Sequence, residues 1–170
     1  MGEDGFFTIG DNCLDVYVAQ GYYAVGGNAF NVAANWVLHG LRPRYLGAVG
    51  DDRAAALLLD GVREARLDPE DVRRLPGLTG VTFIRLQDGD RQLLHEEFGV
   101  GLDLTLSDEE IRAAAAGSWA HVQGTSPDAL IVPRLVQAGA RVSVDLSTYH
   151  DTSDLDGVAV AFASVDDPGA

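Results

Sequence analysis

Segments typical of β-strands alternate with segments typical of α-helices along most of this sequence. In residues 30–38 the apolar positions recur at the spacing of one helix face, and Gly40 ends the pattern. This alternation predicts an α/β fold, a doubly wound and mostly parallel sheet with helices on both faces. The expected strands are residues 6–9, 44–49, 120–123, 141–146 and 158–163, and the expected helices are residues 30–38, 54–62, 107–116 and 130–138.

Two segments do not fit the alternation and predict a small protruding β structure. Leu14, Val16 and Val18 alternate with polar or less apolar residues, as in a half-exposed strand. Residues 81–86 and 92–97 flank the turn Asp-Gly-Asp, which is typical of a β-hairpin. We therefore expect these segments to stand away from the main sheet.

The charge of the chain excludes several functions. All 12 basic side chains are Arg, 26 side chains are acidic, and the formal net charge is −14. A chain without Lys has no Walker-type lysine and no Schiff-base lysine. An acidic surface repels nucleic acid and anionic lipid. We therefore expect no nucleic-acid or membrane partner, and no apolar run approaches the roughly 20 residues that span a bilayer. We expect a cytoplasmic chain, because its first residues lack signal-peptide features and its single cysteine can form no internal disulfide.

The most informative polar segment is Gly26-Gly27-Asn28, which precedes the clearest helix. Two glycines let the backbone approach a ligand closely, and a helix start presents unpaired N–H groups. The amides of Asn28 and Asn31 both donate and accept hydrogen bonds, as sugar hydroxyls do. The plainer interpretation is a tight turn in which Asn caps the helix and no ligand binds.

Ordered motifs carry a resemblance to a known family. GDNCLD at residues 10–15 together with GGNAFNVA at residues 26–33 resembles the ribokinase-like (PfkB) carbohydrate kinases, and GDN-x-x-D-x-Y resembles the fructoselysine 6-kinase branch. The resemblance spans essentially the whole chain. Further agreement lies in GAVGDD at 47–52, GDR at 89–91, VDLS at 144–147 and FAS at 162–164.

The resemblance implies a sugar-binding site. Asp15 matches the acidic residue that holds substrate hydroxyls, with an exposed polar position on a strand as its plainer interpretation. Asn28 stands where many relatives carry Lys. Arg91, which follows the hairpin turn, would close over the site or reach an anionic part of the substrate, although such an Arg is more often solvated. By the resemblance, Asp15, Gly27, Asn28 and Asn31 are expected to bind substrate, with Arg91 as a further candidate. Gln123 and Asp145 are added because each ends a predicted strand, where ligands bind in such sheets, although Asp145 also suits a turn or helix cap.

The resemblance also implies what lies outside these residues. Relatives use ATP and Mg²⁺, and their catalytic Asp lies in a Gly-Ala-Gly-Asp motif of the C-terminal half, which none of these 170 residues match. Residues 158–163 predict an interior strand with little sequence after it to cover its face. We therefore expect the front part of a longer kinase, inactive alone, with no catalytic residue assigned.

The expected organisation is one incomplete domain, residues 1–170, with lid segments at 14–25 and 81–100. Its partners would be a sugar or fructosamine and, through the lid, a second copy. The alternative is a non-catalytic sugar-binding or dimerisation module derived from a kinase. We expect no metal site, because the four His lack ligand spacing and Asp51-Asp52 suits a helix cap.

Overall fold

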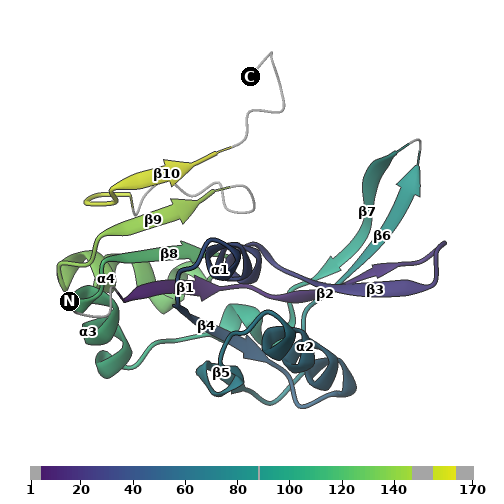
Figure 1. Cartoon of the computed structure of the whole chain (residues 1–170), viewed down its shortest axis with the longest axis horizontal. Coiled ribbons are helices and arrows are strands. Elements are labelled where there is room, and N and C mark those ends of the chain that lie inside the picture. The colour runs from purple at the N-terminus through teal and green to yellow at the C-terminus, as the bar shows by residue number, and fades with distance from the viewer. Residues whose placement is uncertain (1–4, 88, 147–154, 164–170) are drawn as a thin grey trace.

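The computed structural model describes residues 5–87, 89–146 and 155–163, and its centre is a parallel sheet (Figure 1). This large sheet has the strand order β10-β9-β8-β1-β4-β5, and all of its strand pairs are parallel. The predicted parallel sheet is therefore confirmed. Its strands are β1 (Phe6–Gly10), β4 (Pro43–Val49), β5 (Val72–Arg74), β8 (Trp119–Gln123), β9 (Val142–Asp145) and β10 (Val160–Phe162).

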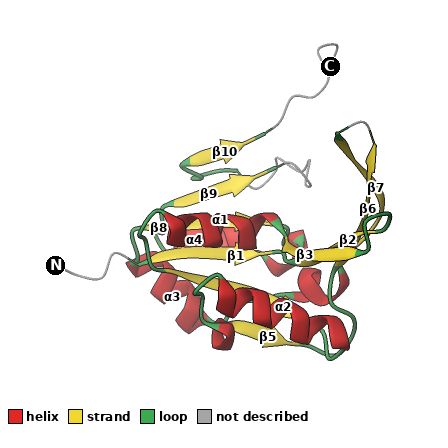
Figure 2. Ribbon diagram, turned by 45° about the vertical axis from the view of Figure 1, so that its right-hand side comes forward, coloured by secondary structure: helices red, strands yellow, loops and turns green. Residues whose placement is uncertain are grey.

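Helices cover both faces of the large sheet, as the sequence predicts (Figure 2). α1 (Asn28–Leu38) and α2 (Arg53–Glu64) share one apolar core with Tyr45 and Val49 of β4. α3 (Asp108–Ala116) and α4 (Ile131–Gln137) share the other core with alternate residues of the same strands, such as Leu46. The odd and even positions of β4 thus serve opposite cores, since side chains alternate along a strand.

A small sheet extends away from the large one (Figure 1). It has the order β3-β2-β6-β7 and contains the predicted hairpin. β2 pairs with β6 in parallel, which joins two segments far apart in the sequence. Its strands are β2 (Cys13–Tyr17), β3 (Tyr22–Gly26), β6 (Val81–Gln87) and β7 (Asp90–Glu97).

The two faces of the small sheet have different surroundings. Leu14 is buried in the core that α2 shares, so we name its side the α2 face. Cys13, Asp15 and Tyr17 alternate with Leu14 and therefore point to the opposite side, which we name the open face. Paired residues of neighbouring strands point to the same side, so the open face continues through Thr82, opposite Asp15, and Ile84, opposite Tyr17, which are both buried, to the exposed strand β7.

Three short 3₁₀ helices connect the main elements, at Pro69–Asp71, Gly99–Asp103 and Pro127–Ala129. After the last of these, Leu130 adopts a left-handed conformation, with φ of 50°. α4 therefore begins at Ile131, one residue later than predicted. The predicted capping box of α3 is confirmed, with Ser107 accepting from the backbone N–H of Glu110. β10 is shorter than predicted and lies at one end of the strand order.

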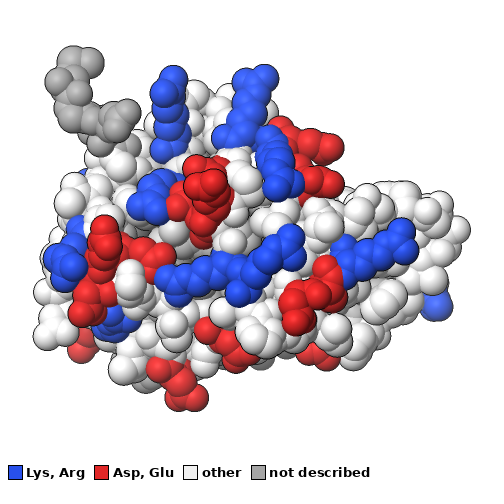
Figure 3. Space-filling view, turned by 90° about the horizontal axis from the view of Figure 1, so that it is seen from below, with Lys and Arg blue, Asp and Glu red and all other residues white. Residues whose placement is uncertain are grey.

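Charged side chains of both signs are interspersed on the face in Figure 3. Several Arg side chains form ion pairs, including Arg44 with Asp71 and Arg73 with Glu110. In the described part of the chain, no helix is both long and apolar enough to cross a bilayer.

Candidate functional site

The junction between β1 and α1 is held by one acidic side chain. The Asp11 carboxylate accepts hydrogen bonds from the backbone N–H groups of Asn28, at 3.0 Å, and Ala29, at 2.9 Å. The cap position itself is Gly27, which has no side chain to offer. The predicted Asn cap of this helix is therefore wrong, because the capping carboxylate comes from the loop after β1.

Gly27 is required by both its backbone and its surroundings. Its φ is 103°, a conformation that L-residues rarely adopt. A Cβ atom placed there would lie 2.4 Å from the Cα of Asn12. The glycine-rich segment therefore packs directly on the loop after β1.

The side chain of Tyr45 stabilises the loop after β1 through hydrogen bonds. Its buried hydroxyl lies 3.1 Å from the carbonyl oxygen of Asp11 and 3.2 Å from that of Gly10, and it accepts a hydrogen bond from the Asn12 amide. Burial raises the pKa of Tyr45, so the hydroxyl stays protonated and can donate. The loop is thus fixed by buried neutral hydrogen bonds.

Asp15 lies over the same turn from the side of the small sheet. A Cβ atom on Gly26 would lie 2.6 Å from one of its carboxylate oxygens. The Cys13 thiol donates to the other oxygen, at 3.2 Å. Burial, and then the charge of Asp15, raise the pKa of Cys13, so the thiol stays protonated as this hydrogen bond requires.

The predicted site residues fall into three places. Asp15, Gly27 and Asn28 meet at the β1–α1 junction, and Asn31 follows on the first turn of α1, where its N–H donates to the carbonyl of Gly27. Gln123 joins them through its backbone, because its carbonyl accepts from the N–H of Asp11 at 3.1 Å.

Asp145 and Arg91 lie apart from that junction. Asp145 ends β9, the neighbour of β8 in the large sheet. Arg91 is exposed near the tip of the β6–β7 hairpin. The structure therefore does not bring Arg91 to the junction.

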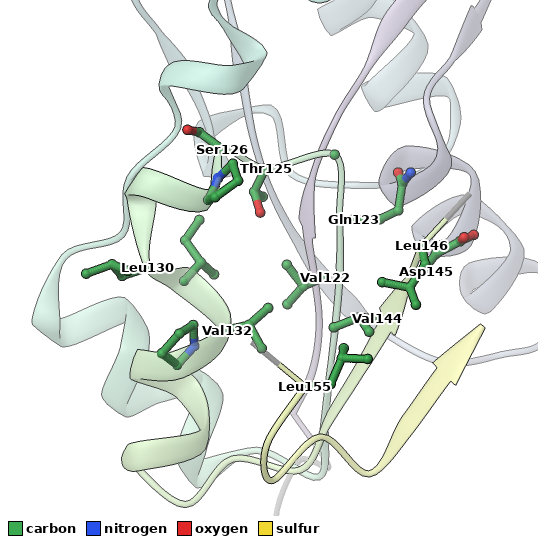
Figure 4. A pocket seen from close by; sticks show the side chains of 14 residues that line it. Val122, Gln123, Thr125, Ser126, Leu130, Val132, Val144, Asp145, Leu146 and Leu155 are labelled. Carbon is green, nitrogen blue, oxygen red and sulfur yellow. The ribbon is translucent and has the colours of Figure 1, made fainter. Parts of the chain in front are cut away.

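A small cavity of about 80 Å³ lies between α4 and the ends of β8 and β9 (Figure 4). Val122, Val144 and Leu155 contribute apolar side chains to it, while Gln123 and Asp145 lie on the side away from α4. The other predicted site residues do not line it. It is mainly an apolar cavity, separate from the polar junction.

The start of α1 does not fit a phosphate group. Burial raises the pKa of Asp11, an effect that its hydrogen bonds from Ala29 and Asn28 oppose. A carboxylate already occupies the N–H groups that would bind an anion, and its charge would repel one. The described residues also contain no group of three or more His, Cys, Asp or Glu side chains that could hold a metal ion. This junction suits neutral hydroxyl groups instead.

The expected capping role of Asp52 is confirmed. Its carboxylate accepts from the N–H of Ala55, at 2.9 Å, and from the hydroxyl and N–H of Thr79. Burial works to raise the pKa of Asp52, but these hydrogen bonds outweigh it and the pKa is lowered.

Sequence reasoning missed Asp11 and Tyr45 as parts of the site. Asp11 lies inside the GDN motif, but the motif shows only a turn and not its hydrogen bonds to a helix 17 residues later. Tyr45 lies in an apolar strand, and nothing in the sequence indicates that its hydroxyl reaches the loop after β1.

Several known proteins with similar sequences or folds are kinases of sugars or fructosamines. A fructoselysine 6-kinase of Escherichia coli K12 is 33% identical over 147 residues, which are 85% of this chain and 56% of the relative. A fructosamine kinase of Bacillus subtilis is 35% identical over 93 residues, which are 54% of this chain and 33% of the relative. The chain thus spans about half the length, or less, of these curated relatives.

The fold is similar to that of solved sugar kinases. The Arabidopsis thaliana ribokinase, solved with ribose and ATP, superposes with a TM-score of 0.81 at 19% identity, covering 96% of this chain and 60% of the ribokinase. A Xylella fastidiosa fructokinase with bound ATP gives a TM-score of 0.67 at 19% identity, covering 84% of this chain and 51% of that one. The ribokinase-like fold class is therefore confirmed.

A match to a protein-family model agrees with these relatives. Residues 6–132, which include the β1–α1 junction, both sheets' central strands and the hairpin, match the model of the pfkB family carbohydrate kinases. The chain belongs to the pfkB family of carbohydrate kinases.

Proposed function

We propose that this chain forms the substrate-binding part of an ATP-dependent sugar kinase whose substrate is a fructosamine or a related sugar. The β1–α1 junction carries the proposal. There the carboxylate of Asp15 lies over Gly26, which is followed along the chain by the turn at Gly27 and by Asn28, the first residue of α1. An ionised carboxylate that accepts from sugar hydroxyls is a strong anchor, and Asn amides match the remaining donors and acceptors.

The proposed substrate class comes from the relatives. A fructoselysine 6-kinase and a fructosamine kinase both match this chain at a third of their aligned positions or more. The site also suits an uncharged sugar better than a phosphorylated one, because Asp11 and Asp15 lie at its base. Gln123 and Asp145, at the ends of β8 and β9, are proposed to bind the sugar from the other side.

We assign to the small sheet the role of a lid over the sugar. Its open face begins at Asp15 and extends beyond the large sheet (Figure 1). A lid that excludes water would favour transfer to a sugar hydroxyl over hydrolysis.

The nucleotide is proposed to bind elsewhere than at the junction. Ribokinase and fructokinase structures contain ATP, but the start of α1 is capped by Asp11 and does not fit its phosphates. ATP with Mg²⁺ would supply the phosphoryl group. The residues of this junction bind and orient the sugar, and we propose that the 170-residue chain alone transfers no phosphate.

The alternative function is a sugar-binding or dimerisation module. Tyr23 and Phe83 lie on the α2 face of the small sheet, 50% and 39% exposed, and exposed apolar residues of this kind favour contact with another protein surface. A second copy of the chain is the partner this alternative predicts.

Sugar binding tests the proposal most simply. Fructoselysine, fructose, ribose and glucose are added in turn, and the melting temperature of the chain is measured. We expect fructoselysine to raise it, because a ligand that binds only the folded state stabilises that state. Asp15→Asn should abolish the shift, whereas Asp60→Asn, an exposed residue of α2, should keep it. No shift with any sugar would contradict the proposal.

A second assay tests whether this chain alone transfers phosphate, and ultracentrifugation then separates the kinase proposal from a dimerisation module. The chain is incubated with ATP, Mg²⁺ and fructoselysine, and ADP release is measured. We expect no turnover by this chain alone. Turnover would overturn the assignment of a substrate-binding part without catalytic residues, and a dimer without sugar binding, seen by analytical ultracentrifugation, would favour the module.

A further inference from the structure

The open face of β7 carries three kinds of side chain in a fixed order. Glu96 lies opposite Thr82, Leu93 opposite Ile84, and Arg91 opposite Leu86. A register shift between Phe83 and Ile84 lets Glu96 and Leu93, which are three residues apart, lie on the same side. Thr82 and Ile84 in turn lie opposite Asp15 and Tyr17 of β2. Because directly paired residues point to one side of a sheet, an acid, an apolar residue and a cation follow one another outward from the level of Asp15.

Each of these side chains is available to a ligand. Glu96 is exposed and shares the side of Asp15 through the pairing of both with Thr82, and its negative charge adds slightly to the raised pKa of Asp11. Leu93 is 63% exposed, on the same face as the stacked rings of Tyr17 and Tyr22. Arg91 is exposed and forms no ion pair with another described residue.

The spacing suits an extended molecule. Glu96 and Arg91 lie opposite Thr82 and Leu86 of β6, which are four residue steps apart, or about 13 Å along the strand. The long flexible side chains of Glu96 and Arg91 shorten this gap from both ends. An alkyl chain joined to a sugar through an amine covers such a distance.

We propose that Glu96, Leu93 and Arg91 select the amine-linked part of the substrate: a protonated amine at Glu96, an aliphatic chain along Leu93, and a terminal carboxylate at Arg91. The preferred substrate is then a sugar linked through its amine to an amino acid with a long side chain. This inference rests on the proposed function, because the sugar itself is held at Asp15.

The α2 face of the same hairpin provides an internal control. Glu97 lies opposite Val81, Phe83 opposite His95, and Arg85 opposite Gln92, so a similar set of side chains points the other way. That set is on the side of Leu14 and not of Asp15. Continuity with Asp15 therefore distinguishes the open face, and its variants can be compared with matched ones on the α2 face.

The test is calorimetric titration of the full chain with three ligands: fructoselysine, the fructose adduct of pentylamine, which lacks the carboxylate and the α-ammonium group, and fructose. The fructose adduct of 6-aminohexanoate, which keeps the carboxylate without the α-ammonium group, is the matched control and should bind as fructoselysine does. We expect fructoselysine to bind about tenfold more tightly than the pentylamine adduct, as one charge-assisted hydrogen-bonded pair allows. Arg91→Gln should remove this preference, and Arg85→Gln should keep it.

The amine contact has its own matched pair. Glu96→Gln should reduce the preference for the pentylamine adduct over fructose by about threefold to tenfold, whereas Glu97→Gln should not change it. Leu93→Ser should weaken binding of both adducts and leave fructose binding unchanged.

The outcomes separate this inference from the function on which it rests. Fructose binding that depends on Asp15, with equal affinities for all three ligands, would overturn the inference and leave the proposed function intact. If no ligand binds, both fail. If Leu93→Ser changes the oligomeric state in ultracentrifugation and not ligand selectivity, the open face contacts a second copy and the inference is wrong.

Discussion

The β1–α1 junction and the β6–β7 hairpin lie at opposite ends of the proposed sugar site and are built in opposite ways. At the junction, Gly27, Asp11 and Tyr45 are fixed by close packing and buried hydrogen bonds. In the hairpin, every residue of β7 is exposed. Substitutions at the junction should therefore cost stability, whereas substitutions in the hairpin should change which substrate is preferred and leave stability almost unchanged.

The largest expected effect is at the cap of α1. Gly27→Ala should destabilise the fold by about 3 kcal/mol, because φ is positive and the new Cβ would clash with Asn12. Urea unfolding followed by circular dichroism measures this. Gly21→Ala is the control, since Gly21 has φ of 69° but open space around it, and should cost about 1 kcal/mol. Equal losses would show that close packing at Gly27 adds nothing.

The second prediction compares the loss of stability at a buried leucine and at an exposed leucine of the small sheet. Leu14→Ala should cost about 3 kcal/mol, because Leu14 is 4% exposed in the α2 core. Leu93→Ala should cost less than about 0.5 kcal/mol, because Leu93 is 63% exposed. Both are read from urea unfolding midpoints. A large loss of stability in Leu93→Ala would contradict the expectation that the exposed side chains of β7 affect substrate preference and not folding.

The third prediction concerns the carboxylate of Asp11, which lies outside α1 and accepts hydrogen bonds from its first backbone N–H groups. Asp11→Ala leaves the N–H groups of Asn28 and Ala29 without their acceptor and should cost about 2 kcal/mol. Asp60→Ala, which removes only an exposed pair with Arg63, serves as the control and should be nearly neutral. The same unfolding curves decide this, and similar small losses in both variants would show that Asp11 is dispensable.

The smallest effect is on acid stability. The pKa of Asp52 is lowered in the folded chain, so its contribution is present above the ordinary Asp pKa and is lost as pH falls through the lowered value. Asp52→Asn should therefore make the free energy of unfolding fall less steeply between about pH 5 and pH 2. A slope that Asp52→Asn does not reduce would show that the hydrogen bonds from Thr79 and Ala55 do not favour the ionised form.

Much of the large sheet could be predicted because local signals and packing agree there. The apolar spacing of residues 30–38 and the capping box at Ser107 and Glu110 each specify a helix from nearby residues alone. β3 was not predicted, because Tyr22, Tyr23 and Ala24 show no apolar–polar alternation and are exposed. Its position depends on pairing with β2, which local sequence does not reveal.

The candidate site also contains residues that could be predicted from the sequence and residues that could not. The glycine pair and Asp15 could be found from a motif, since each has a local signature. The hydrogen bonds of Asp11 and Tyr45 join segments 17 and 34 residues apart and are visible only once the chain has folded. The side of the sheet that Arg91 shares with Asp15 likewise depends on the register of β2, β6 and β7.

Backbone amide NMR during titration with fructoselysine tests the central claim most directly, because it locates the sugar on the chain. We expect chemical-shift changes to concentrate at Asp11, Asp15 and residues 26–31, with weaker sets at Gln123 and Asp145 and along β7. Changes confined to the apolar cavity of Thr125, Val132 and Leu155, with none at the start of α1, would contradict it.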